Sequence, residues 1–279
     1  MTSVSVDPAA GPIPCPTAPK LELRRVSRHF ATPRGPVPAL KELSFTVAPS
    51  ELVCVLGPSG CGKSTLLNLL AGLDRPDEGC VLEDGAAITG ASRDRMVMQQ
   101  EPALFPWLTA RGNVEFALKA TGLSKAERRE RAEEYLHLVG LGSFGRAHPH
   151  ELSGGMKQRC ALARALALDP SVLLLDEPFA ALDALTSDRL HEALERIWQQ
   201  TGKTIVFVTH NVREAVRLGD RVLTLSARPA RLLQEVRVEL PRPREQEDPA
   251  LAALAAQVKR SLSAEIGRHL AEELYEGAG

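Results

Sequence analysis

The sequence has little of what a membrane-spanning, nucleic-acid-coating or secreted protein needs. It contains no run of about 18 apolar residues, so nothing in it predicts a membrane-spanning helix. Its 34 Lys and Arg residues face 35 Asp and Glu residues, and a net charge of −1 argues against a basic protein that coats nucleic acid or anionic lipid. Its five cysteines are an odd number without a CxxC pair, which indicates a reducing compartment, the cytoplasm, rather than a disulfide framework or a zinc site.

Residues 1–20 have neither the basic start nor the continuous apolar stretch of a secretory signal, and they contain five prolines. We expect this segment to be a disordered tail. The whole chain, at 279 residues and 44% hydrophobic, can bury a large core and fits one large domain or two modest ones.

The most informative segment reads GPSGCGKST and joins a buried strand to a helix. The apolar run 52–56 precedes it and the leucine-rich stretch 66–70 follows it. In such a loop backbone N–H groups converge on a phosphate chain, Lys63 reaches the terminal oxygens, and the Ser64 hydroxyl holds Mg²⁺. The flanks favour this phosphate loop over an unliganded glycine-rich turn. Its predicted binding residues are Gly57, Pro58, Ser59, Gly60, Cys61, Gly62, Lys63, Ser64 and Thr65.

One residue of the loop carries a further expectation. Cys61 lies close to a helix N-terminus and to Lys63, and both features favour a thiolate. We therefore expect alkylation of Cys61 to inhibit the protein.

Two acidic residues, Asp176 and Glu177, end the apolar run 172–175. At a strand end beside the phosphate loop, Asp176 can order Mg²⁺ and its waters. Glu177 is aimed differently because it is the next residue, and it can accept a proton from an attacking water. Two acids that merely begin a loop are the alternative, and the phosphate loop on the same chain disfavours it.

A second candidate anion site reads LSGGMKQR and runs into a helical stretch. Ser153 is a good N-cap, and Gly154 and Gly155 expose backbone N–H groups at the helix start. Taken alone, this segment favours a plain serine-capped helix over an anion site. Together with the phosphate loop and the acidic pair, it resembles the LSGGQ signature loop of the ATP-binding subunits of ABC transporters, with Met156 in place of glutamine.

The resemblance implies roles for single residues elsewhere. Gln100 is similar to the Q-loop glutamine, which touches Mg²⁺ and signals to the membrane subunit; Gln99 is the alternative. Asp183 resembles the D-loop residue that reaches across a dimer, and His210 the switch histidine that contacts the terminal phosphate. Phe30 stands where the family keeps an aromatic residue that stacks on adenine, a core position being the alternative.

The fold class that the resemblance implies is α/β: a RecA-like P-loop NTPase core with an N-terminal antiparallel β subdomain and a helical signature subdomain. The pattern of the chain agrees, because alternating segments in 21–50 predict an antiparallel sheet. Continuous apolar runs at 172–175 and 204–208, separated by a helical stretch, are typical of a parallel sheet with crossover helices.

These expectations divide the chain into three parts. The ATP-binding domain covers about 21–240, and its helical subdomain covers about 101–167. Residues 241–279 form a Pro/Arg/Glu linker followed by an amphipathic helix, whose apolar residues recur at three and four positions. We expect that helix to pack on its own domain; packing on a second copy and a regulatory role are the alternatives.

By the same resemblance the chain is an ATPase that binds ATP and Mg²⁺ between two copies, with the phosphate loop of one facing the signature loop of the other. Lys63, Gln100, Glu177 and His210 are the implied catalytic residues, and Ser64, Gln100 and Asp176 the implied metal ligands. The implied partners are a second copy, integral-membrane permease subunits at the cytoplasmic face of the inner membrane and, indirectly, a solute-binding protein, with no nucleic acid.

The segments 104–109, 225–231 and 240–244 resemble those of importers for nitrate, sulfonates and taurine, which implies a small anion as cargo. Three alternatives compete with a transport ATPase: an ABC ATPase of DNA repair or chromosome organisation, a translation-factor ATPase, and a small-molecule kinase with a phosphate loop. The absence of a coiled-coil or zinc insertion, the single cassette and the signature loop disfavour them in turn.

Overall fold

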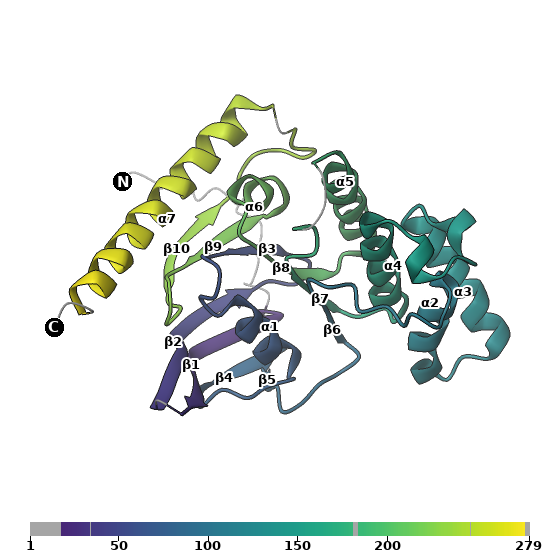
Figure 1. The fold of residues 1–279 in the computed structure, drawn as a ribbon, viewed down its shortest axis with the longest axis horizontal. Helices are drawn as coiled ribbons and strands as arrows, with labels where there is room; N and C mark the ends of the chain where they lie inside the picture. Colours follow the sequence, from purple (N-terminus) through teal and green to yellow (C-terminus); the bar gives the residue numbers. More distant parts are fainter. Residues whose placement is uncertain (1–17, 34, 181–183, 246, 277–279) are drawn as a thin grey trace, which may run out of the picture.

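The structure is a computed structural model and describes residues 18–33, 35–180, 184–245 and 247–276 (Figure 1). Two sheets and a group of helices build it. Side chains are described as far as residue 263, apart from residues 184 and 185 at the start of one helix. Within these ranges no helix combines the length and the apolar character that crossing a bilayer requires.

An antiparallel sheet of four strands forms the lower part of Figure 1, with the order β2-β1-β4-β5. Its strands are β1 (Leu21–Thr32), β2 (Gly35–Val47), β4 (Glu78–Glu83) and β5 (Ala86–Ala87). The central strand β1 pairs antiparallel with both β2 and β4. The sheet predicted from residues 21–50 is therefore present, and it is completed by two strands that follow the phosphate loop.

The second sheet has six strands in the order β10-β9-β3-β8-β7-β6. Its strands are β3 (Leu52–Leu56), β6 (Arg95–Met98), β7 (Val172–Asp176), β8 (Thr204–Thr209), β9 (Arg221–Leu225) and β10 (Leu232–Arg237). All neighbours pair in parallel except β10, which is antiparallel to β9. Every residue of β3, β8 and β9 is buried, which explains the continuous apolar runs in β3 and β8.

The register of the central strands decides where the site lies. Leu56 at the end of β3 pairs with Thr209 at the end of β8, and Asp176 at the end of β7 pairs with Val208. The loops that follow these three strands therefore emerge at one edge of the sheet. In open α/β sheets ligands bind at this carboxyl edge.

The helices lie on both sides of this sheet and beyond it. Their bounds are α1 (Lys63–Ala71), α2 (Ala110–Leu118), α3 (Lys125–Leu138), α4 (Gly154–Ala167), α5 (Ala184–Thr201) and α6 (Val212–Leu218). Short 3₁₀ turns occur at Lys119–Thr121, Gly142–Phe144 and Pro149–Glu151. In Figure 1 the helices α2, α3 and α4 gather at the side away from the antiparallel sheet, as the expected helical subdomain does.

The segment after β10 is held more tightly than its linker-like composition suggested. Arg244 is 4% exposed, and its guanidinium donates to the backbone carbonyls of Val216, Arg217 and Gly219 at the end of α6. Burial lowers the pKa of Arg244 to about 10. The sequence placed this arginine in a Pro/Arg/Glu linker. Composition does not reveal which backbone carbonyls a side chain will contact.

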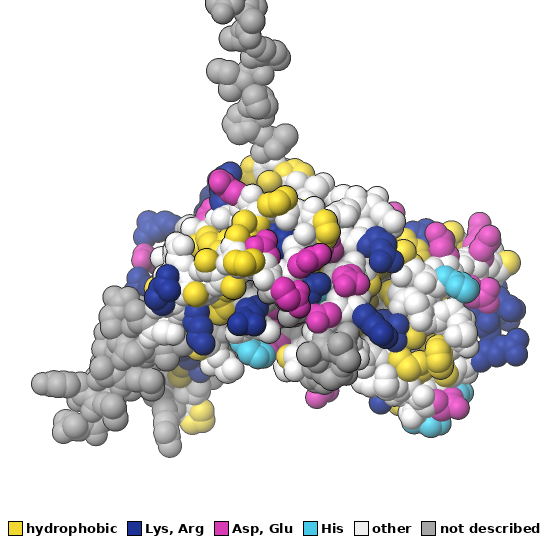
Figure 2. All heavy atoms as spheres, turned by 90° about the horizontal axis from the view of Figure 1, so that it is seen from above, with side chains coloured by type: hydrophobic (Ala, Val, Ile, Leu, Met, Phe, Trp, Pro, Cys, Tyr) yellow, Lys and Arg dark blue, Asp and Glu magenta, His cyan; other side chains and the backbone are white. Residues whose placement is uncertain are grey.

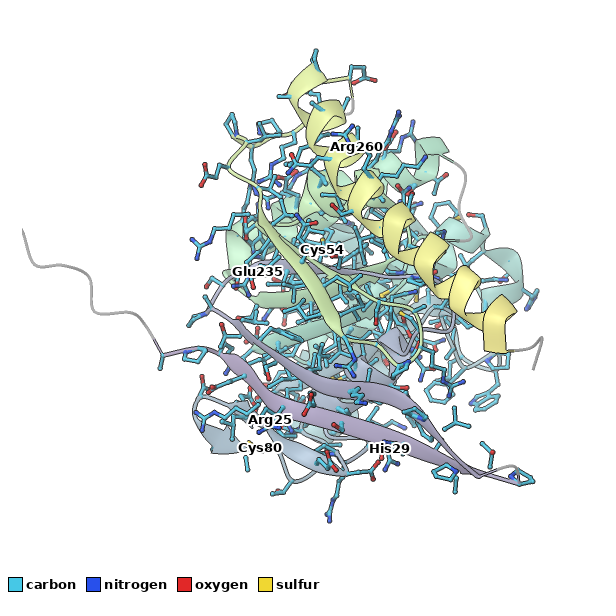
Figure 3. The ribbon with its side chains drawn as sticks, turned by 90° about the vertical axis from the view of Figure 1, so that its left-hand side faces the viewer. Arg25, His29, Cys54, Cys80, Glu235 and Arg260 are labelled. Carbon is cyan, nitrogen blue, oxygen red and sulfur yellow. The ribbon has the colours of Figure 1, made fainter. Side chains whose placement is uncertain are left out.

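The last helix, α7 (Pro249–Glu276), packs against α6. Its buried residues Leu251, Ala255, Val258 and Leu262 follow the predicted apolar stripe. On the face seen in Figure 2 acidic and basic side chains lie interspersed rather than in a field of one sign, in keeping with the near-zero net charge. Figure 3 shows Cys54 inside the molecule and Cys80 on the antiparallel sheet.

Candidate functional site

A cavity of about 350 Å³ lies at the edge of the parallel sheet where the phosphate loop begins. Its lining comes from the loop after β3, the start of α1, the segment after β6 and the end of β7. The lining residues are Ser59, Gly60, Gly62, Lys63, Ser64, Thr65, Gln100, Asp176 and Glu177. The structure thus brings together most of the residues that sequence reasoning assigned to phosphate, metal and base.

The backbone of the phosphate loop requires glycine at two positions. Gly60 and Gly62 have φ angles of 77° and 119°, a region that side chains disfavour. A Cβ on Gly62 would also lie 2.9 Å from the carbonyl oxygen of Ala39, because β2 runs directly behind the loop. Gly62 supplies no side-chain cap to α1, so the first N–H groups of this helix remain available to an anion.

Lys63 and Glu177 meet across the cavity. The ammonium of Lys63 donates to the carbonyls of Gly57 and Pro58 at 2.9 and 3.0 Å, and it lies 3.4 Å from Glu177 Oε1. The other oxygen of Glu177 lies 2.7 Å from His210 Nδ1. The phosphate-loop lysine, the expected base and the expected switch histidine are therefore in direct contact.

The two neighbouring carboxylates point in different directions, as their adjacency predicted. The Ser64 hydroxyl hydrogen-bonds Asp176, whereas Glu177 turns away at a φ of 43°. Burial raises the pKa of Asp176 above its usual range, and the hydrogen bond from Ser64 opposes this shift. Burial disfavours the charged form of Asp176, so a nearby cation would stabilise its carboxylate.

The lining of the cavity fits Mg²⁺. Ser64, Asp176 and Gln100 offer hydroxyl, carboxylate and amide oxygens, the hard ligands that this ion takes together with substrate phosphates. The described residues contain no cluster of three or more His, Cys, Asp or Glu side chains that would hold a metal by protein ligands alone.

The expectation that Cys61 is a thiolate is wrong. Its side chain is 1% exposed and packs beneath Gly57, where an added Cβ would lie 2.7 Å from the Cys61 sulfur. Burial raises the pKa of the Cys61 thiol above its ordinary value, and the Lys63 ammonium offsets only part of that shift. Proximity in the sequence to a lysine and a helix start did not reveal that the sulfur faces the core.

The two candidate glutamines lie in different places. Gln100 lines the phosphate cavity, whereas Gln99 lines a separate groove of about 450 Å³ between β6, α2 and α4. Two side chains of α4 hold the segment after Gln100. Gln158 donates to the Gln100 carbonyl at 2.6 Å, and Arg164 donates to the carbonyls of Pro102 and Ala103.

Sequence reasoning missed Gln158 and Arg164. They lie 58 and 61 positions from the backbone groups that they contact, and no local pattern marks them. The contacts connect the helix of the signature loop to the Q-loop backbone, so the two segments are expected to move together.

The signature-loop residues and Phe30 are not among the residues that line this cavity. Ser153 caps α4 by accepting the N–H of Met156 at 3.3 Å, and Ser153 and Gly154 are exposed. Phe30 pairs with Val37 across the antiparallel sheet. The Arg28 guanidinium lies over the Phe30 ring, 5.1 Å from the ring centroid. Asp183 lies outside the residues that the structure describes.

Comparisons with known proteins place these features in a family. The family model described as ABC transporter matches residues 40–180, a span that contains the phosphate loop, the signature loop and the acidic pair. The nitrate import ATP-binding protein NrtD of Synechocystis sp. is 50% identical over 79% of this chain and 83% of its own length. The taurine import ATP-binding protein TauB of Burkholderia thailandensis is 48% identical over 77% of this chain and 82% of its own length.

Solved structures show the same fold. The dimeric post-hydrolysis structure of the ATP-binding cassette MJ0796, bound to ADP and Pi, superposes with a TM-score of 0.72 at 34% identity, over 79% of this chain and all of that one. Because the family model spans the phosphate loop, the signature loop and the acidic pair, and these relatives match more than three quarters of the chain, the chain belongs to the ABC transporter family as one of its ATP-binding cassettes.

Proposed function

We propose that this chain is the ATP-hydrolysing subunit of an ABC importer and works as a homodimer at the cytoplasmic face of the membrane. The observation that carries the proposal is the cavity that joins Lys63, Ser64, Asp176 and Glu177. Its lining supplies a phosphate cradle, metal ligands and a base, but not the signature residues. A second copy would supply those residues from its exposed Ser153 and Gly154.

The residues of the cavity divide the work of phosphoryl transfer. Backbone N–H groups of the loop and the Lys63 ammonium bind the β- and γ-phosphates of ATP. Mg²⁺ held by Ser64, Gln100 and Asp176 would neutralise the charge that develops on the phosphate oxygens. Glu177 accepts a proton from the attacking water, and His210 donates to the γ-phosphate.

The contacts in the structure suggest how these groups become available. A γ-phosphate competes for the Lys63 ammonium, which lies 3.4 Å from Glu177. It also competes for His210, whose Nδ1 lies 2.7 Å from the same carboxylate. When both partners turn to the phosphate, Glu177 loses two hydrogen-bonding partners and can take a proton from water.

The groove between β6, α2 and α4 is the proposed docking place of the permease. It is lined by Leu73, Phe105 and Phe116 among other residues, and Leu73 and Phe116 are exposed apolar side chains. Trp107, also exposed, lies next to Phe105 with ring centroids 5.5 Å apart. Because Gln158 and Arg164 tie α4 to the Q-loop, a segment in this groove would sense closure of the dimer.

The cargo proposed from the relatives is a small anion, such as nitrate or taurine, which a solute-binding protein would deliver to the permease. The test is reconstitution of this chain with its permease in liposomes and measurement of ATP-dependent uptake of labelled nitrate and taurine. Uptake that requires ATP and is abolished by Glu177→Gln supports the proposal. ATP hydrolysis that is indifferent to the permease, with no uptake of either anion, would contradict it.

A further inference from the structure

A chain of hydrogen bonds connects α5 to the backbone that carries His210. His191 Nε2 lies 2.5 Å from Glu214 Oε1, and the Thr209 hydroxyl donates to the other oxygen of Glu214. The backbone N–H of Asn211 then donates to Thr209 Oγ1 at 2.9 Å. Thr209 and Asn211 are the two sequence neighbours of His210. These hydrogen bonds therefore hold the backbone on both sides of the expected switch histidine.

The direction of each hydrogen bond follows from chemistry. An ionised carboxylate only accepts, so His191 must carry its proton on Nε2 and Thr209 must donate its hydroxyl proton to Glu214. The lone pairs of Thr209 Oγ1 are thereby left for the Asn211 N–H. Glu214 itself lies in the first turn of α6, which the Asn211 side chain caps by accepting the N–H of Arg213 at 3.0 Å. Every donor in the chain has its acceptor.

His191 is a polar side chain in a buried position. The side chain is 4% exposed, and its ring meets the edge of Phe179 at 5.2 Å. Within the described part of the chain its Nδ1 is buried and has no hydrogen-bond partner. A buried polar ring costs free energy that an apolar residue of similar size would avoid. The contact with Glu214 is the feature that offsets this cost.

His191 is also connected to the segment that carries the catalytic carboxylate of Glu177. Phe179, two residues after Glu177, touches the rings of both His191 and Phe207. On the other side His210 Nδ1 lies 2.7 Å from Glu177. Glu177 is thus connected to His191 by the short backbone segment to Phe179 and the ring contact of Phe179, and to His210 by a hydrogen bond. His191 is therefore linked to the segments that carry both Glu177 and His210.

We propose that His191 is a positioning residue that, through Glu214 and Thr209, sets the orientation of His210 toward the γ-phosphate. The inference rests on the proposed role of His210 in ATP hydrolysis. His191 is not among the residues that line the phosphate cavity. It acts by holding the backbone of residues 209–211 in one arrangement against α5.

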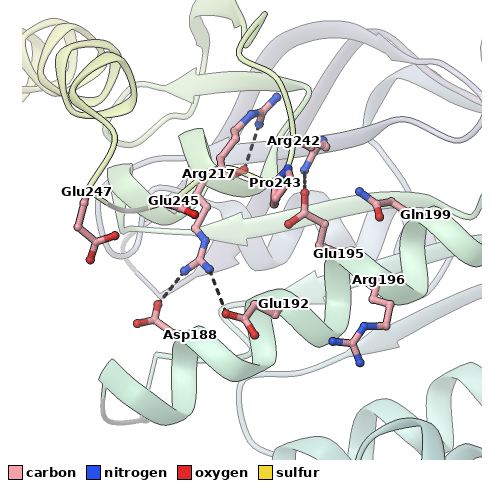
Figure 4. A pocket seen from close by; sticks show the side chains of 11 residues that line it. Asp188, Glu192, Glu195, Arg196, Gln199, Arg217, Arg242, Pro243, Glu245 and Glu247 are labelled. Carbon is pink, nitrogen blue, oxygen red and sulfur yellow. Dashed lines mark hydrogen bonds and ion pairs between the residues drawn. The ribbon is translucent and has the colours of Figure 1, made fainter.

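A neighbouring contact provides the control for simple packing. Arg217, also on α6, donates to Asp188 on α5 at 2.7 Å, one turn before His191 (Figure 4). This ion pair joins the same two helices, and Asp188 Oδ1 lies 3.8 Å from His191 Nδ1. The Arg217 guanidinium, however, pairs with Asp188 and Glu192 on α5 and not with the side chains of Glu214 or Thr209. If His191 only held the helices together, loss of Arg217 should have a similar catalytic effect.

The experiment compares purified full-length variants by kcat and KM for MgATP and by Tm. His191→Leu and Thr209→Val are expected to lower kcat about tenfold with KM within about twofold, because the phosphate loop is untouched. His191→Gln and Thr209→Ser, which keep a donor at each position, should restore most of kcat. Arg217→Met should lower Tm while kcat stays within about twofold of the wild type.

Three outcomes would overturn the proposal: a folded His191→Leu with wild-type kcat, a His191→Gln no better than His191→Leu, or an Arg217→Met with the same loss of kcat. If His191→Leu does not fold, the Thr209 pair decides by the same criteria. His210→Ala in the same assay distinguishes the proposed role of His210 from the proposed positioning role of His191. Full activity of His210→Ala would refute the role of His210, whereas its inactivity beside a wild-type His191→Leu would refute the positioning role alone.

Discussion

His210 Nδ1 lies 2.7 Å from Glu177 Oε2, while Lys63 Nζ lies 3.4 Å from Glu177 Oε1. Each oxygen of the carboxylate thus faces its own nitrogen, and both nitrogens are groups that a γ-phosphate would attract. The side chain of Glu177 is largely buried, so these contacts are weakly screened by water. We therefore expect a bound γ-phosphate to draw both nitrogens away and so free the Glu177 carboxylate.

The first prediction concerns that carboxylate. Glu177→Gln should bind ATP as the wild type does but lower kcat about 100-fold or more, since the amide has the same size and cannot take a proton from water. ATP should then hold a closed dimer, detectable by size-exclusion chromatography with and without nucleotide. Lys63→Ala is the matched control and should weaken ATP binding itself in calorimetry. Near-wild-type phosphate release by Glu177→Gln would refute the assignment of the base.

The second prediction tests whether two chains share each site. Lys63→Ala and Ser153→Arg homodimers should both be inactive, because every site in either one carries a lesion. In a mixed dimer one site collects both lesions and the other none, so an equal mixture should recover up to about a quarter of wild-type ATPase activity.

Failure to recover in proven mixed dimers would mean that the two sites are obligately coupled or not shared. Cysteines placed at Ser59 and Ser153 distinguish these cases. Only a shared site lets them crosslink between chains when ATP is present.

The third prediction follows from the buried thiol in the phosphate loop. Since burial raises the pKa of Cys61, its alkylation at pH 7 to 8 should be slower than that of Cys80, which is less buried. The measurement is mass-spectrometric mapping of iodoacetamide adducts over time. Faster labelling of Cys61 than of Cys80 would contradict the buried position of its sulfur.

The same pKa shift has a consequence for stability, and its sign can be worked out. In the unfolded chain Cys61 loses its proton near the ordinary pKa of 9.0, whereas the folded chain keeps it to higher pH. The native state therefore binds more protons in that interval, so the free energy of unfolding falls as pH rises above about 9. Cys61→Ser should reduce this alkaline slope.

The fourth prediction concerns the proposed docking groove. Phe116 lines the groove and is 44% exposed, while Phe144 is 43% exposed in the same helical region and does not line it. Phe116→Asp should therefore abolish co-purification with the co-expressed permease and leave the ATPase activity of the isolated subunit within about twofold, since a charge in the groove must be desolvated on docking. Phe144→Asp should preserve assembly. Equal loss in both variants would place the permease elsewhere.

The sequence predicted best those features that a few contiguous residues encode. The phosphate loop depends on glycines at fixed positions between an apolar strand and a helix, and its φ angles of 77° and 119° at Gly60 and Gly62 follow from that local requirement. The acidic pair likewise ends a buried strand, and the parallel sheet follows from continuous apolar runs. The roles of Phe30, Asp183 and the signature residues remain predictions.

Other features required residues distant in the chain to meet. Arg244 reads as part of a charged linker, yet it is buried because the carbonyls at the end of α6 lie within its reach. His191 reads as one polar residue on a helix, and only the packing of α5 against α6 brings it to Glu214. Composition and periodicity predict the local structure of a segment, but not the distant residues that its side chains contact.

The sequence by itself therefore predicted the chemistry of the site, because the residues proposed as phosphate cradle, metal ligand and base belong to short contiguous segments. The tertiary structure decided which of two glutamines enters the cavity, that the Cys61 sulfur faces the core, and that His210 is tied to α5. The physical reason is that side-chain direction, burial and hydrogen-bond partners depend on neighbouring elements, and those neighbours are fixed only when the chain packs.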